Sequence, residues 1–302
     1  MEKVYKKYFH NIDSAYFVFS RFASFELIFE DFPDEYFDKN IRPRMGRKET
    51  DNSIGRILQE CGLVFIGQYL GEESLSKEEA LQENNYRKLR EVIIHHKAEI
   101  QDSFMETCRA AKKYIMDEIK DCKNVCVVDL GWNGKSIVYL KHLCERKYQW
   151  NGSIIGAMVG ACKSEVVQNY IRTGLISTYA FENELWRNRG KKDGVGMEYE
   201  ECICMEALFS SESDTLLRYG FDENGDVKFI YGKKNKNQEI IREIHNGILD
   251  FAENFMPVIQ KYDLKITARD AYIPLDWSMK NEKYKDTIYK KYYEEPNAMN
   301  GF

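Results

Sequence analysis

The sequence has no apolar run of about 18 residues, the length that a membrane-spanning helix needs. It also lacks the apolar core of a secretory signal peptide, since its first residues read MEKVYKKYFHNID. Neither sign of charge dominates, because the net charge is −5 and basic residues are interspersed among acidic ones. Such a balance argues against a general nucleic-acid binder. These absences predict a cytoplasmic protein that has no membrane span and does not bind nucleic acid.

Histidine is scarce, with five residues in 302, and the sequence offers few ways to build a metal site from it. His95 and His96 are adjacent in a stretch that predicts a helix, where successive side chains point about 100° apart. A metal ion shared by these two residues is therefore not expected. His142 and His245 stand alone, without a nucleophile to pair with. The eight cysteines lie in apolar, periodic segments without zinc spacing, which predicts buried, reduced thiols.

The second half of the chain has the alternation of strands and helices that is typical of an α/β fold. Val125–Asp129 is an apolar run followed by a glycine turn, and Lys135–Glu145 reads as the next helix. Ser153–Val159 is a second buried strand, and Ile176–Phe181 is expected to be a third. The spacing fits a βαβ unit, so parallel strands are expected. We therefore predict a Rossmann-like, mainly parallel sheet with large helical additions.

The remaining segments predict additions to this sheet. Ala15–Ser20, AYFVFS, reads as a further buried strand. Residues 50–120 or so predict a helical insertion, with a capping box at Ser76. A turn at Asp222–Asp226 predicts a small antiparallel hairpin that joins the sheet. The expected organisation is an α/β domain over residues 1–262 and a C-terminal helical extension over residues 263–302.

The segment VCVVDLGWNGKS, residues 125–136, has the order strand, acid, glycine turn and helix start. A nucleotide P-loop requires a glycine where Asp129 stands, and a carboxylate there would repel the phosphates. The methyl-donor loop of adenosylmethionine-dependent methyltransferases fits Asp129 and Gly131, but Trp132 and Asn133 break its glycine spacing. We reject the P-loop and regard the methyl-donor loop as weakly supported.

A third interpretation places a ligand at the carboxyl end of the strand. Asp129 would hold a metal ion or a sugar hydroxyl, and the N–H groups of Gly134, Lys135 and Ser136 would meet an anion. Lys135 would add positive charge and Ser136 a hydroxyl. The structural alternative is that Asp129 caps the following helix and Trp132 packs on the core.

These residues resemble a known family. VVDLGWNG, with YFVFSR at residues 16–21 well before it, resembles the haloacid dehalogenase-like proteins of bacterial surface-polysaccharide gene clusters. Those proteins carry a D-[IL]-G-W-x-G box after a strand and an aromatic strand ending in Ser-Arg. The stretch MEALFSSESDTLLRY, residues 205–219, is similar to the segment that follows the box in that family. The resemblance spans about residues 16–219 by motif order.

The resemblance implies a role in surface-polysaccharide assembly with a phosphosugar, nucleotide sugar or glycan as ligand. It implies that Ser20 binds a phosphoryl oxygen and that Arg21 neutralises it. The position of Asp129 at the strand end makes it the expected catalytic and Mg²⁺-binding residue. Trp132, Asn133, Gly134, Lys135 and Ser136 would line the substrate site. For Ser20 and Arg21 the alternative is a strand end that meets solvent.

The chain departs from the family at the nucleophile. Haloacid dehalogenase-type phosphatases attack with the first aspartate of D-x-D-x-[TV], and this motif is absent from the sequence. The chain is then either the carboxyl-terminal module of a longer protein or a shorter relative without that phosphatase site. Three functions remain open: phosphoester hydrolysis or transfer, glycosyl transfer from a nucleotide sugar, and a binding or scaffold module that assists a partner catalytic domain.

Two further features have both a functional and a structural interpretation. Glu206 lies in the apolar segment ECICMEALF and is either a buried acid or the solvent-facing edge of a helix. Basic residues gather in two loops, where they would grip a diphosphate or an anionic glycan, or form ordinary solvated surface. These residues are Arg42, Arg44, Arg47, Lys48, Arg187, Arg189, Lys191 and Lys192.

Overall fold

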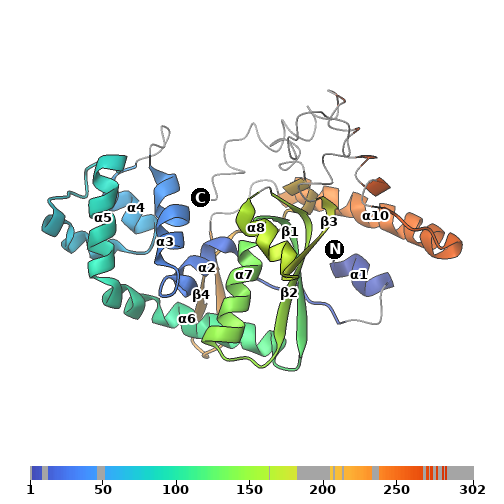
Figure 1. Ribbon diagram of the computed structural model, residues 1–302, viewed down its shortest axis with the longest axis horizontal. Helices are drawn as coiled ribbons and strands as arrows, with labels where there is room; N and C mark the ends of the chain where they lie inside the picture. Colours follow the sequence, from blue (N-terminus) through green and yellow to red (C-terminus); the bar gives the residue numbers. More distant parts are fainter. Residues whose placement is uncertain are drawn as a thin grey trace.

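The fold is described from a computed structural model of the chain (Figure 1). The structure describes residues 2–8, 13–45, 52–162, 164–181, 205–206, 208–212, 214–232 and 238–267, and single residues between 270 and 283. Its centre is a three-stranded parallel sheet in the order β1 (Asn124–Trp132), β2 (Ser153–Ala161) and β3 (Ile176–Phe181). The predicted α/β class with parallel strands is confirmed.

Helices connect the parallel strands as expected for successive βαβ units. β1 leads into α7 (Lys135–Lys141), which continues as the π-helix η5 (His142–Lys147), and α8 (Glu165–Arg172) joins β2 to β3. Parallel crossovers are almost always right-handed, so two successive ones place their helices on the same face of the sheet. α7 and α8 lie together in front of the strands in Figure 1. Their apolar side chains Ile137, Leu140 and Val167 are buried in the core.

The region from residue 54 to residue 119 is mainly helical, as predicted, with a non-helical segment between η4 and α5. It contains α4 (Ile54–Glu60), the 3₁₀ turns η3 (Val64–Gln68) and η4 (Leu70–Glu73), and the long helices α5 (Glu83–His95) and α6 (Lys97–Ile119). α6 extends from this helical region to the part that holds the sheet (Figure 1).

The predicted hairpin exists but does not join the parallel sheet. β4 (Leu216–Phe221) and β5 (Val227–Tyr231) pair antiparallel as a separate two-stranded sheet. Both strands pack against α6, and the Tyr219 side chain of β4 is fully buried there. The hairpin covers its apolar face with a helix instead of extending the main sheet, so the expectation that it joins the sheet is wrong.

The aromatic segment Ala15–Ser20 is extended but forms no strand, so that expectation is also wrong. The backbone groups of Val18 are bound by two tyrosine hydroxyls. Tyr114 of α6 accepts a hydrogen bond from the Val18 N–H at 2.8 Å, and the Tyr219 hydroxyl donates to the Val18 carbonyl at 2.8 Å. Phe17 stacks on Tyr114 with ring centroids 5.2 Å apart. Aromatic side chains therefore fix this segment without a neighbouring strand.

The capping box expected at Ser76 closes a turn and not a helix. The Glu79 carboxylate accepts from the Ser76 N–H at 3.1 Å, as in a capping box. The helix begins later, where Gln82 and Asn85 form the capping box of α5. The capping-box pattern at Ser76 is therefore formed, but the chain makes another turn before the helix α5 begins.

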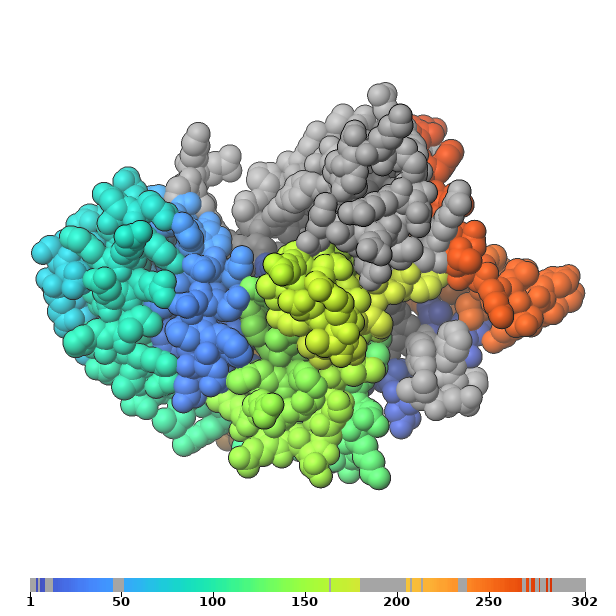
Figure 2. Space-filling model, viewed as in Figure 1, coloured from blue at the N-terminus to red at the C-terminus, as the bar shows by residue number. Residues whose placement is uncertain are grey.

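The N-terminal residues beyond Ser20 connect the two parts of the molecule. They form α2 (Arg21–Ile28), α3 (Pro33–Tyr36), the π-helix η1 (Phe37–Ile41) and the 3₁₀ turn η2 (Arg42–Arg44). In the space-filling view, a blue strip of these residues lies between the teal helical region and the green helix α7 (Figure 2). α2 contacts both α6 and α7, so it joins the helical region to the sheet.

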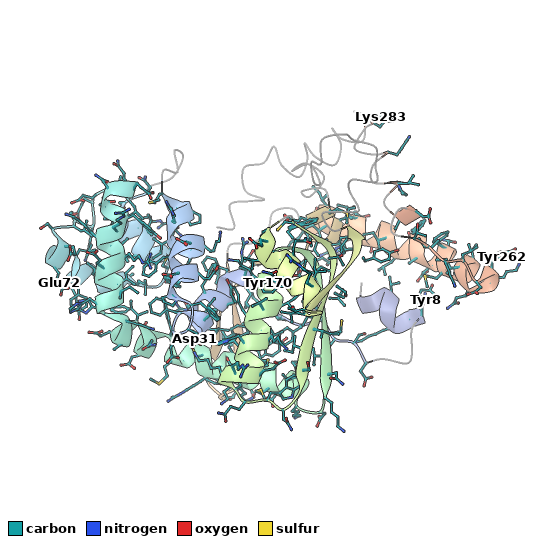
Figure 3. The ribbon with its side chains drawn as sticks, in the orientation of Figure 1. Tyr8, Asp31, Glu72, Tyr170, Tyr262 and Lys283 are labelled. Atoms are coloured by element: carbon teal, nitrogen blue, oxygen red, sulfur yellow. The ribbon has the colours of Figure 1, made fainter. Side chains whose placement is uncertain are left out.

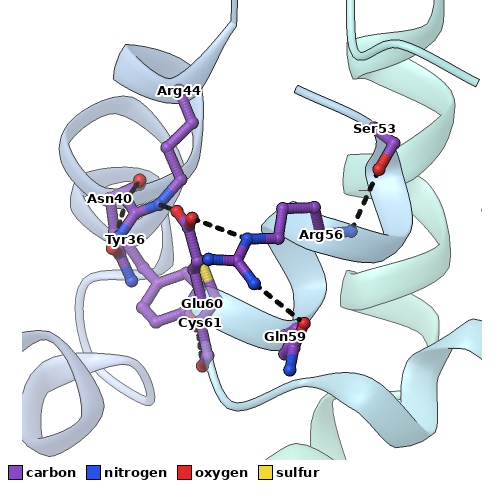
Figure 4. Close-up of polar contacts among 8 residues, drawn as sticks. All are labelled: Tyr36, Asn40, Arg44, Ser53, Arg56, Gln59, Glu60 and Cys61. Atoms are coloured by element: carbon purple, nitrogen blue, oxygen red, sulfur yellow. Dashed lines mark hydrogen bonds and ion pairs between the residues drawn. The ribbon is translucent and has the colours of Figure 1, made fainter. Parts of the chain in front are cut away.

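Arg44, from the first basic cluster, is a buried structural residue (Figure 4). Its side chain is 4% exposed, and its Nε lies 3.2 Å from the Glu60 carboxylate. Its Nη1 donates to the Asn40 side chain at 2.8 Å, and Arg56 reaches the other oxygen of Glu60 at 3.2 Å. Arg42 pairs with Glu83 at the surface. Arg47, Lys48 and the second basic loop lie outside the described residues.

At the C-terminal end of the described α/β part, α10 (Gln238–Tyr262) is a long helix, and α1 (Glu2–Tyr8) lies beside it (Figure 1). Most of the proposed extension over residues 263–302 lies outside the described residues. None of the helices in the described part of the chain combines the length and the apolar character that a bilayer crossing needs.

Candidate functional site

The candidate site is the carboxyl end of β1, where the backbone takes an unusual course. The strand continues past Asp129 to Trp132, so the glycine turn begins inside the ladder and not after it. Gly131 has φ +125°, and a Cβ added there would lie 2.1 Å from the Gly160 carbonyl oxygen of β2. Trp132 has φ +71°, which is rare for a bulky residue. Strained backbone of this kind gathers at functional sites.

Asp129 is a half-buried carboxyl on this strand. Burial raises the pKa of the Asp129 carboxyl above its usual value, although the backbone N–H groups of Leu130 and Gly131 partly oppose the rise. Within the described part of the chain, no cationic side chain contributes to this shift. A desolvated acid without a salt bridge is the kind of group that a bound cation or hydroxyl stabilises.

The side chains after Asp129 are held by contacts within the protein. The Trp132 indole N–H donates to the Glu206 carboxylate at 2.7 Å, and Glu206 itself is exposed. Glu206 therefore lies at a solvent-facing edge, as one of its two interpretations expected. The Asn133 side-chain oxygen accepts from the Cys162 thiol at 3.1 Å.

Gly134 begins α7 in the left-handed conformation, with φ +61°. A Cβ there would lie 2.3 Å from the Ile176 side chain of β3, so the turn packs directly on the sheet. Ser136 is half-buried in the first turn of α7. The N–H groups of Gly134, Lys135 and Ser136 thus lie at the start of the helix, as the sequence predicted.

Lys135 is part of a polar cluster that the sequence did not reveal. Its Nζ lies 2.5 Å from Oε1 of Glu35 in α3, and the Tyr139 hydroxyl donates to the same carboxylate at 2.8 Å. Burial acts to raise the pKa of Glu35, but the hydrogen bonds of Lys135 and Tyr139 and the lysine charge outweigh it and lower that pKa. Burial and the charge of Glu35 both raise the pKa of Tyr170 on α8, which is labelled in Figure 3.

Ser20 and Arg21 lie at the start of α2. The Ser20 hydroxyl accepts from the Ala23 N–H at 2.9 Å as the N-cap of the helix, and it donates to the Leu216 carbonyl at 2.7 Å. Both hydrogen-bonding roles of the hydroxyl are thus taken in the free protein. Arg21 is exposed. Burial and the contact with Glu35 raise the pKa of the Tyr139 hydroxyl, and the charge of Arg21 partly opposes this rise, so Arg21 acts on the Lys135 cluster electrostatically.

The structure therefore brings several of the expected residues to one edge of the sheet. Asp129 and residues 132–136 are contiguous there, and Arg21 approaches from α2. Ser20 precedes Arg21 in the sequence, but its hydroxyl donates a hydrogen bond to the hairpin strand β4. Glu35 and Tyr139 were missed, because no sequence pattern links a carboxylate to a lysine 100 positions later.

Mg²⁺ fits this edge only as an ion that shares its ligands with substrate. Among the described residues, no group of three His, Cys, Asp or Glu side chains includes Asp129. Magnesium commonly binds through one or two carboxylates together with substrate phosphates and water. Asp129 would supply the carboxylate, and the remaining ligands would come from phosphate and water.

Comparison with known proteins adds no assignment. No protein-family model matches the sequence, and the search of curated proteins found no matching relative. The functional proposal therefore rests on the residues of the site and on the resemblance of the sequence motifs.

Proposed function

We propose that the protein binds a phosphorylated sugar or nucleotide sugar at the carboxyl end of β1 and hydrolyses or transfers its phosphoester. The setting would be the assembly of bacterial surface polysaccharide, as the family resemblance implies. The observation that carries the proposal is Asp129, a half-buried carboxyl with a raised pKa and no cationic side-chain contribution among the described residues. A ligand that brings a metal ion or hydroxyl groups would stabilise the ionised form of this group.

The surroundings of Asp129 support an anionic ligand. Lys135 opens the helix that follows the strand, and the exposed Arg21 lies near Tyr139 on the same side. Helix N-termini and basic side chains both favour phosphate. Lys135 is held by Glu35 in the free protein, so a phosphate would compete with this carboxylate for the lysine.

Asp129 serves in this proposal as a ligand to metal or sugar and not as a nucleophile. The D-x-D-x-[TV] motif that supplies the attacking aspartate in the resembling phosphatases is absent from the sequence. When bound, Mg²⁺ would neutralise phosphate charge. The chain itself would position the phosphate with Lys135 and the N–H groups of residues 134–136.

A binding module is the second candidate, and two contacts favour it. Ser20 uses its hydroxyl as a helix cap, and Lys135 is paired with Glu35, so two of the expected phosphate ligands serve the fold itself. In this role the protein would present a glycan or nucleotide sugar to a partner catalytic domain.

Thermal denaturation with a panel of phosphosugars and nucleotide sugars, with and without Mg²⁺, tests the proposal. We expect a rise in the melting temperature with one class of ligand that requires Mg²⁺. Inorganic phosphate release by that ligand would identify hydrolysis. Release of a nucleoside diphosphate only in the presence of a sugar acceptor would identify glycosyl transfer. Ligand binding without turnover would favour the binding module.

The Asp129→Asn variant assigns the residue, and Asp121→Asn is its matched control. Asp121 is an exposed acid before the amino end of β1, so it probes the same charge change away from the site. We expect Asp129→Asn to abolish the Mg²⁺-dependent stabilisation and Asp121→Asn to retain it. A ligand response that is equal in the two variants would show that Asp129 is not part of the site.

A further inference from the structure

The helical region contains a break between α5 and α6 that alters the environment of two histidines. α5 ends at His95, and His96 has φ −97° and ψ +29° before α6 begins at Lys97. The expectation that both histidines lie in one regular helix, about 100° apart, is therefore wrong. The break brings their rings to a centroid separation of 5.1 Å.

A carboxylate from another element completes this cluster. Glu72 lies in the 3₁₀ turn η4, and both of its carboxylate oxygens lie 3.1 Å from Nε2 of His96. The ligand atoms of Glu72, His95 and His96 all lie within 4.8 Å of one another. Side-chain rotations would bring atoms at such separations to about 2.0–2.2 Å from a shared ion.

We propose that Glu72, His95 and His96 bind a divalent transition-metal ion of the zinc type. Two imidazoles and one carboxylate are a common protein ligand set for zinc with an open fourth position. Imidazole nitrogen favours zinc, cobalt or nickel over magnesium, which prefers oxygen ligands. The site is distinct from the edge of β1, because Glu72 lies at the outer end of the helical region, away from Tyr170 on α8 (Figure 3).

The surroundings of His96 match those of metal-bound histidines. Its second nitrogen, Nδ1, lies 3.3 Å from the Glu99 carboxylate in the first turn of α6. Such a carboxylate fixes the tautomer in which Nε2 faces the metal. The His96 ring also stacks on Tyr69, with centroids 3.5 Å apart, so its orientation is set before an ion arrives.

The exposure of the three ligands gives an ion access from solvent. His96 is buried, whereas Glu72 and His95 are exposed on the outer side of the cluster. An ion can therefore enter from the Glu72 side, and water can occupy the fourth position. Bound metal would tie η4 to the junction of α5 and α6, because Glu72 comes from η4 and the two histidines from that junction.

The competing arrangement is an imidazolium that donates to Glu72 and Glu99 and binds no metal. In that state Nε2 of His96 carries a proton where the metal would bind. The two states make opposite predictions for metal titration of the full-length chain at neutral pH.

Titration with Zn²⁺ by calorimetry, and with Co²⁺ by absorption spectroscopy, tests the proposal on the reduced protein. We expect about one ion per chain and a cobalt spectrum without thiolate-to-metal charge transfer. Saturating Zn²⁺ should raise the melting temperature by about 5 °C or more, whereas Mg²⁺ at the same concentration should not.

Variants locate the bound ion. Glu99→Gln should weaken Zn²⁺ binding by about 10–100-fold, and His95→Gln and Glu72→Gln by at least as much. His142→Gln is the control, because His142 also pairs with a carboxylate, Asp31, at 3.0 Å. The proposal would be overturned if the parent protein does not bind Zn²⁺, or if His95→Gln and Glu72→Gln bind it as tightly as the parent. It would also be overturned if His142→Gln weakens Zn²⁺ binding as much as these two variants do.

Discussion

Replacement of Gly131 by alanine tests the close approach of β1 and β2 at the candidate site. Gly131 has φ +125°, a conformation that residues with a side chain rarely adopt, and its Cβ would meet the Gly160 carbonyl oxygen at 2.1 Å. Both groups belong to paired backbone, so the clash cannot be relieved by rotating a side chain. The substitution must therefore either bend β1 or separate the two strands.

The expected loss follows from two contributions. Strained backbone costs about 1–3 kcal/mol for a residue with a side chain. Forcing an extra methyl group into packed structure costs about 1–3 kcal/mol more. Gly131→Ala should therefore lower the free energy of unfolding by about 2–6 kcal/mol, a large fraction of the usual 5–15 kcal/mol.

Two other glycines separate these contributions. Gly174 has φ +73° with no atom within 4 Å of an added Cβ, so Gly174→Ala should cost only about 1–2 kcal/mol. Gly71 has neither a positive φ nor a neighbour within 4 Å, so Gly71→Ala should be neutral or stabilise by up to about 1 kcal/mol.

Urea denaturation followed by circular dichroism measures all three variants against the parent. The expected order of stability is Gly71→Ala, then Gly174→Ala, then Gly131→Ala. If Gly131→Ala is no less stable than Gly174→Ala, the approach of Gly131 to Gly160 is not as close as described. The shape of the candidate site would then need revision.

Three further variants test contacts elsewhere in the fold. Arg44→Met should cost about 1–3 kcal/mol because it leaves the buried side-chain oxygen of Asn40 without its donor, whereas Arg42→Met at an exposed pair should cost at most about 1 kcal/mol; equal losses in urea would refute the burial of Arg44. Tyr219→Phe should cost about 1–3 kcal/mol in the same assay, because it leaves a backbone carbonyl without its donor, and no loss would contradict that hydrogen bond. The pKa of Glu35 is lowered in the folded state, so its pairing with Lys135 stabilises the protein above its ordinary value of 4.5 and is lost as pH falls below it. Glu35→Gln should therefore be less stable than the parent by about 1 kcal/mol at neutral pH, and the difference should shrink on acidification; a constant difference would refute the pairing.

The order of strands and helices around β1 could be predicted from the sequence, because each element has its own local pattern. Val125–Asp129 is an apolar run followed by a glycine turn, and the spacing to Ser153–Val159 leaves room for one helix. The prediction of a strand was wrong where the backbone of an apolar segment is hydrogen-bonded by side chains and not by a neighbouring strand. Ala15–Ser20 has the composition of a strand, but tyrosines 96 and 201 residues away from Val18 bind its backbone instead.

The residues of the candidate site also fall into a group that the sequence could predict and a group that it could not. Asp129 and residues 132–136 could be singled out because they are contiguous in the chain and their spacing has chemical meaning. The role of Ser20 as a helix cap bound to Leu216 could not be anticipated, since the second contact spans 196 residues. Glu35 was missed for the same reason.

The sequence by itself determined which segments form strands and helices near β1, because those preferences arise between residues a few positions apart. Only the tertiary structure decided which side chains meet across long separations, such as Glu35 with Lys135 and Glu72 with His96. Such contacts depend on how helices pack on one another and on the break at His96. Packing is set by the shape of the whole core, and no short stretch of sequence contains that information.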